Sequence, residues 1–182
     1  MSWKNTDVRY GHLSIAMHWF MLLLIAAVYA CIELRENYPK GSDIREALKT
    51  WHYMLGLSVL ALVWVRIAFR TLGSSPRIEP PLSGWQTTMA KLMHFALYLL
   101  MVGQPLLGWL ILSAEGDPIP FFGLQLPALV GTDKELVEVF EEIHETSGTV
   151  GYFLIGMHAA AALLHHYYTR DNALVRMLPA KE

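Results

Sequence analysis

The fold is decided by residues 143–170, which read IHETSGTVGYFLIGMHAAAALLHHYYTR. The stretch is mostly apolar, and it carries His144 near its start and His158 in its middle. Because these residues are 14 positions apart, an α-helix would separate them by about 21 Å along its axis and by roughly 40° in rotation. A helix of this length spans a bilayer, and ionisable groups inside a membrane are costly enough to indicate function. We therefore expect two imidazoles on nearly one face of a transmembrane helix.

The composition is typical of a membrane protein. Of the 182 residues, 54% are hydrophobic and only 16% are charged, which is more apolar than a soluble domain of this length requires. The single cysteine, Cys31, excludes an internal disulfide framework and a thiolate metal cluster. A net charge of −2 indicates no nucleic-acid partner. We expect one membrane-embedded domain over residues 1–182.

Four apolar runs have the length of membrane spans. Their predicted bounds are residues 13–32, 51–70, 90–112 and 144–168. The first run ends in a weak lipoprotein-like pattern at Cys31, but its length and its internal His18 favour a retained helix over a cleaved leader. Pro105 is expected to kink the third run without ending it. The predicted fold class is all-α, an integral membrane four-helix bundle.

The connectors are expected at residues 33–49, 73–81 and 114–142. In the last of these, residues 132–135 match a capping box and predict a short amphipathic helix leading into His144. Nine basic residues lie in the N-terminus, the second connector, the C-terminal tail and the adjoining helix ends, against five on the opposite side. The nine are Lys4, Arg9, Arg66, Arg70, Arg77, Lys91, Arg170, Arg176 and Lys181. The positive-inside rule therefore places both termini in the cytoplasm.

On this topology four histidines fall at two depths. His18 is level with His158 toward the cytoplasm, and His52 is level with His144 toward the outer side. Two such pairs facing the interior of a four-helix bundle are what two b-type haems require, because each iron takes two axial nitrogens on opposite faces. Zinc would instead need its ligands at one depth, often with carboxylate or thiolate among them. A packed structural histidine is the alternative at each position.

Two more histidines lie at the inner level. His94 has no evident partner there and is interpreted as a polar packing residue. His165 follows His158 by seven residues, about two helical turns further inward and about 20° away in rotation. It should face the edge of the inner haem, where it could serve a propionate or donate a proton to a reducible substrate. An interfacial histidine in water is the alternative.

The sequence resembles the bacterial cytochrome b561 family and, within it, the superoxide oxidase type. The resemblance covers nearly the whole chain and rests on residues 16–19 (AMHW), 156–168 (GMHAAAALLHHYY) and 171–177 (DNALVRM). It implies two haem b groups, with ligands His18, His52, His144 and His158. It also implies electron exchange with ubiquinone in the inner membrane, with His165 as the catalytic residue near the quinone. Members of this type oxidise superoxide at the outer haem.

The charge of the outer connectors conflicts with an anionic donor. They carry twelve acidic residues against five bases, a net charge of −7, which should slow an approaching anion. A local cluster of bases near the outer haem could offset this field; the candidates are Arg35, Lys40, Arg45 and Lys49. Two alternatives therefore stay open, a haem-bearing anchor subunit that passes electrons between quinone and a peripheral dehydrogenase or hydrogenase, and a cofactor-free membrane scaffold. A reduced-minus-oxidised optical spectrum separates the last from the others.

Overall fold

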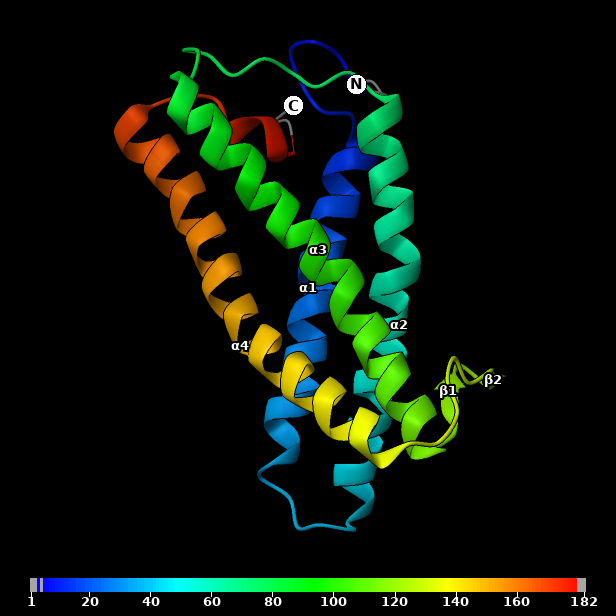
Figure 1. The fold of residues 1–182 in the computed structure, drawn as a ribbon. Helices are drawn as coiled ribbons and strands as arrows, with labels where there is room; N and C mark the ends of the chain where they lie inside the picture. The colour runs from blue at the N-terminus through cyan, green and yellow to red at the C-terminus, as the bar shows by residue number, and fades with distance from the viewer. Residues whose placement is uncertain (1–2, 4, 180–182) are drawn as a thin grey trace. The chain divides into compact units, whose positions relative to one another are not determined.

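The structure is a computed structural model that describes residue 3 and residues 5–179. Within that range the chain forms four long helices, a short hairpin and two short helical turns (Figure 1). The elements are α1 (His12–Arg35), α2 (Asp43–Leu72), α3 (Gly84–Glu115), β1 (Ile119–Phe121), β2 (Leu124–Leu126), α4 (Lys134–Leu164), the π-helix η1 (His165–Thr169) and the 3₁₀ turn η2 (Val175–Met177). All four α-helices are long and apolar enough to cross a membrane, which confirms the predicted four spans.

The helices are longer than the apolar runs that predicted them. The first connector is reduced to residues 36–42, because α1 continues to Arg35 and α2 begins at Asp43. The third run is unbroken, since α3 passes through Pro105 as expected. The predicted short helix before His144 is instead the first part of α4. The Asp133 carboxylate caps α4 by accepting the backbone N–H groups of Glu135 and Leu136, at 2.9 and 3.3 Å.

The chain divides into two compact units. Unit 1 contains Met1–Phe20, Trp64–Leu99 and Val150–Glu182, and unit 2 contains Met21–Val63 and Leu100–Thr149. Each of the four helices therefore contributes one part to each unit. Each candidate histidine pair also falls within a single unit, His18 with His158 in unit 1 and His52 with His144 in unit 2.

In unit 1 three segments that are distant in the sequence are joined by hydrogen bonds. Arg9 donates to the carbonyl of Leu178 at 2.5 Å, and the indole of Trp19 donates to the carbonyl of Met177 at 2.8 Å. The connector between α2 and α3 joins both ends, because the Arg77 N–H bonds the Asp7 carbonyl and the Asn172 N–H bonds the Glu79 carbonyl. These segments carry much of the basic excess; Lys4 and Lys181, two of the nine bases, lie outside the described residues.

In unit 2 the connector after α3 contains a β-hairpin that the sequence reasoning did not predict. Strands β1 and β2 are antiparallel, and their turn places Phe122 and Gly123 at φ 47° and 88°. Ile119 is buried against Leu57 of α2 and Leu112 of α3, with the aromatic rings of Tyr53 and Trp109 packed around them. This apolar cluster anchors the hairpin to the helices, because it removes the strand's larger side chains from solvent.

Candidate functional site

The histidine pair of unit 2 joins α2 and α4. The rings of His52 and His144 have their centres 6.2 Å apart and are inclined by 79°. His52 Nδ1 lies 3.0 Å from the carbonyl oxygen of Val28 on α1. A carbonyl only accepts, so Nδ1 carries the proton and Nε2 keeps its lone pair. Metal-binding histidines usually have this tautomer and donate their other ring N–H to a backbone carbonyl in this way.

His144, the partner of His52, is held in place by a hydrogen bond to its backbone carbonyl. Gln104 donates its side-chain amide to the His144 carbonyl at 3.1 Å and to the Ser147 hydroxyl at 2.5 Å. The His144 Nδ1 atom is buried and has no hydrogen-bond partner in the part of the chain that the structure describes. A buried imidazole nitrogen without a partner is costly in an apolar interior, so its environment is incomplete without a further group.

The pair of unit 1 joins α1 and α4 and has the same spacing. The ring centres of His18 and His158 are 6.3 Å apart and the planes are inclined by 71°. The guanidinium of Arg66, on α2, lies 2.9 Å from His18 Nδ1. His94 is not isolated as the sequence suggested, since its ring centre is 5.5 Å from that of His158. Its Nδ1 is 2.6 Å from the Ala90 carbonyl, one turn earlier on α3.

The two matched spacings fit a metal between the rings. A metal about 2.0 Å from each imidazole nitrogen, with the nitrogen about 1.1 Å from its ring centre, separates two opposed rings by about 6.2 Å. The pairs in units 1 and 2 have this spacing, whereas His94 and His158 are too close for it. Among residues 3 and 5–179, no group of three or more histidine, cysteine or acidic side chains could hold a metal ion. Each pair therefore offers two imidazole nitrogens, the number that a bis-histidine haem requires. A zinc site needs three or four protein ligands, and neither pair supplies them.

Open space lies beside glycines near the candidate ligands. A Cβ atom built on Gly56, one turn after His52, would meet nothing within 4 Å, and the same holds for Gly156, two residues before His158. A planar macrocycle needs such room where it lies against a helix. Together with the orphaned nitrogen of His144 and the ring spacings, these positions fit haem b at both pairs.

His165 lies in a wider turn than the sequence predicted. The α-helix ends at Leu164, and residues 165–169 form a π-helix that is closed by Arg170 at φ 57°. The chain then folds back, so that Asp171 Oδ2 lies 2.5 Å from His165 Nδ1 while Asp171 Oδ1 accepts the Ala173 N–H at 2.9 Å. Asp171 is only 4% exposed. The structure thus adds a buried carboxylate partner for His165, which sequence reasoning missed because the reversal at Arg170 has no local signal.

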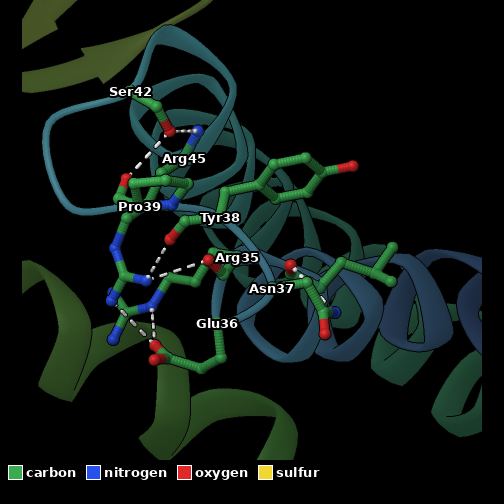
Figure 2. A network of polar contacts seen from close by, with 8 residues as sticks. Arg35, Glu36, Asn37, Tyr38, Pro39, Ser42 and Arg45 are labelled. Carbon is green, nitrogen blue, oxygen red and sulfur yellow. Dashed lines mark hydrogen bonds and ion pairs between the residues drawn. The ribbon is translucent and has the colours of Figure 1, made fainter.

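The basic side chains proposed to attract an anion on the outer side already have partners in several cases. Arg45 donates to the carbonyls of Arg35 and Tyr38 at 2.9 and 3.0 Å, and both arginines contact one oxygen of Glu36 at 3.0 Å (Figure 2). The hydrogen bond from Arg35, together with Arg45, holds the pKa of the Glu36 carboxyl below its usual value. Lys49 lies over the ring of Tyr53, with its nitrogen 5.8 Å from the ring centre. Arg45 therefore closes the connector between α1 and α2, and its charge is largely offset by Glu36.

The sequence matches known proteins along almost its whole length. The model of the family described as prokaryotic cytochrome b561 matches residues 9–180. Cytochrome b561 homolog 1 of Escherichia coli (strain K12) is 38% identical over 174 residues, which are 96% of this chain and 99% of that protein. A protein of Yersinia pestis named probable superoxide oxidase CybB is 35% identical over 173 residues, 95% of this chain and 97% of its own. Cytochrome b561 homolog 2 of Escherichia coli (strain K12) is 28% identical over 179 residues, with 98% and 95% covered.

These matches confirm the resemblance that the histidine-bearing segments indicated. The chain belongs to the prokaryotic cytochrome b561 family, whose members bind haem b, and it is an oxidoreductase and electron carrier built as a multi-pass protein of the bacterial inner membrane.

Proposed function

We propose that this protein is a superoxide:ubiquinone oxidoreductase, a single membrane-embedded domain over residues 1–182 that holds two haem b groups. The observation that carries the proposal is the presence of two separate histidine pairs, each with the ring spacing of a bis-imidazole metal site. The 35% identity to a probable superoxide oxidase supports the choice of donor. Haem b held by these pairs would supply one-electron oxidation and reduction.

The proposed ligands are His52 and His144 for one haem and His18 and His158 for the other. In unit 2 the Val28 carbonyl fixes the proton of His52 on Nδ1, so the lone pair of Nε2 is free to bind iron. Gln104 fixes the backbone of α4 at His144 and thereby the position of that ring. His94 is proposed as a packing residue, because its Nδ1 is tied to its own helix and its ring is too close to His158 for a shared metal.

We place the reduction of ubiquinone at His165. Each quinone takes two electrons and two protons, while each superoxide gives one electron and leaves as dioxygen, so two superoxide anions are consumed per quinol. The Asp171 carboxylate accepts a hydrogen bond from the Nδ1–H group of His165 and leaves Nε2 to carry a proton and deliver it to the quinone oxygen. The second proton comes from the cytoplasm. Asp171 acts as a positioning residue, because the hydrogen bonds of its carboxylate among the described residues are to His165 and Ala173.

We propose that superoxide meets the protein on the periplasmic side of the membrane, near the connector between α1 and α2. A bis-histidine site has no open position for it, so the protein contributes electrostatics and access alone. Arg35, Arg45 and Glu36 together carry one net positive charge, and Lys40 is exposed nearby in sequence. We therefore assign steering of the anion mainly to Lys40 and to Lys49, which lies over the Tyr53 ring and is in none of the ion pairs among the described residues, with Arg45 maintaining the connector.

We also propose that both termini lie in the cytoplasm. The N-terminal segment, the connector after α2 and the C-terminal tail are hydrogen-bonded together in unit 1, and they carry much of the basic excess. The acidic connectors belong to unit 2. This segregation agrees with the positive-inside rule.

The test uses the purified protein in detergent or nanodiscs. A pyridine haemochrome assay should give two haem b per chain, superoxide should reduce them anaerobically, and added ubiquinone should reoxidise them with formation of quinol. Haems that stay oxidised with superoxide, yet are reduced when a co-purifying iron–sulfur protein is present, would assign the chain to the anchor class instead. Absence of haem from protein made under haem-replete conditions would refute the electron-carrier mechanism altogether.

A further inference from the structure

Arg66 lies near the end of the second membrane span and has no anionic partner among the described residues. It lies six residues before the end of α2 and is half-buried. The ion pairs among the described residues do not include it, and its hydrogen bond is to His18 Nδ1 at 2.9 Å. Charged side chains within a span are retained where they pair with another group or serve a site. The neutral imidazole is a weak partner for a guanidinium in this position.

The contact between Arg66 and His18 conflicts with metal binding by His18. A guanidinium only donates, so Nδ1 must be the acceptor and a neutral imidazole then carries its proton on Nε2. In that tautomer neither nitrogen has a lone pair free for iron. His52 in unit 2 has the opposite arrangement, because its Nδ1 donates to the Val28 carbonyl. Binding of haem at His18 therefore requires Arg66 to release Nδ1, and the released guanidinium needs an acceptor within reach.

We infer that Arg66 binds a propionate carboxylate of the haem held by His18 and His158. Haem b carries two propionates at its edge, and the planar guanidinium matches a carboxylate with two parallel hydrogen bonds. The assignment rests on the proposed ligand pair of unit 1. It makes Arg66 part of the cofactor site, and it gives the positive charge beside His18 an anionic partner.

A fixed cation at this site also affects the redox equilibrium of the haem. Reduction lowers the positive charge at the iron by one, so a nearby positive charge stabilises the reduced form. The unit 1 haem then has a higher potential than it would have without Arg66, which favours the arrival of electrons at the His18/His158 site.

The test compares redox titrations of R66Q, R66K and the parent, followed at the absorbance band of each haem. In R66Q the equilibrium constant for reducing one haem should fall at least tenfold, which is about 59 mV for one electron. The other haem should keep its potential and serve as the internal reference. R66K restores the charge and should return the potential to within threefold of the parent in equilibrium constant. R77Q removes an exposed arginine of unit 1 and should change neither haem.

Two results of the R66Q titration would contradict the inference. A higher potential in R66Q would mean that Arg66 stabilises an imidazolate form of His18, and an unchanged potential would mean that Arg66 does not contact the haem; either overturns the inference. If R66Q retains a single haem, R66K should recover the second, and failure to do so would refute a role for the charge. H158A separates this inference from the ligand assignment, because a variant that keeps both haems would disprove the pair itself.

Discussion

Replacement of Asp171 by asparagine should slow the reduction of ubiquinone while leaving both haems in place. The carboxylate serves two donors with separate oxygens, the Nδ1 proton of His165 at 2.5 Å and the Ala173 N–H at 2.9 Å. Asparagine offers one acceptor oxygen, so one of these donors loses its partner. If the asparagine oxygen keeps its bond to the Ala173 N–H, its NH₂ group faces Nδ1 of His165. Nδ1 must then accept a hydrogen bond, so it can no longer carry a proton.

The size of the effect follows from the burial of the pair. The Asp171 side chain is fully buried and the His165 ring is 24% exposed, so solvent replaces little of the lost bond. A hydrogen bond to a charged group contributes about 1.5–3 kcal/mol. Since about 1.4 kcal/mol is a factor of ten, proton delivery should slow by roughly ten- to one-hundredfold. H165F should be at least as slow, with haem content equal to that of the parent.

The assay mixes dithionite-reduced protein with a short-chain ubiquinone in an anaerobic stopped-flow instrument and follows reoxidation of the haems. N172A is the matched control, because Asn172 bonds the Glu79 N–H and the Arg77 carbonyl without touching the His165 side chain. If N172A is as slow as D171N, the effect comes from loosening of the tail. If D171N and H165F both react at the parental rate, His165 has no part in the mechanism.

Three further outcomes are expected. Alanine at both members of either histidine pair should remove one haem equivalent per chain and leave the other, while H94A should keep both; a haemochrome assay that finds one haem in H94A and two in the double variants would reverse the assignment. The rate at which superoxide reduces the protein should fall as salt rises, because the screening length shortens from about 10 Å at 0.1 M to about 3 Å at 1 M, and K40Q/K49Q should be slower at low salt; a rate that increases with salt would exclude steering by these lysines. A cysteine introduced at Gly41 should react with an impermeant maleimide added to intact spheroplasts, whereas one at Ser75 should react after lysis alone, and the reverse pattern would invert the proposed topology.

The helical framework and the pairing of the histidines could be predicted from the sequence, because both follow from periodicity. The four spans required only length and hydropathy, and the depth of each histidine followed from its distance to the end of its run. The structure brings together the partners that were predicted, at 6.2 and 6.3 Å between ring centres. Their role as haem ligands stays a prediction.

The groups that set the chemistry around those histidines could not be predicted. Asp171 reaches His165 because the α-helix widens into a π-turn and then reverses at Arg170, and neither event has a signal as clear as glycine or proline. The contact of Arg66 with His18 depends on the rotation of α2 against α1, which hydropathy does not specify. The hairpin was missed because its turn places a phenylalanine, Phe122, at positive φ, where bulky residues are uncommon.

The division of the chain into units has a consequence for biosynthesis. Unit 2 ends at Thr149, whereas unit 1 needs the segment from Val150 onward as well as the first twenty residues. When the ribosome has made the chain as far as Thr149, every residue of unit 2 exists, while His18 still lacks His158. The two histidine pairs therefore become complete in a fixed order during translation, and in the proposed ligand assignment the His52/His144 pair is the first that can receive a haem.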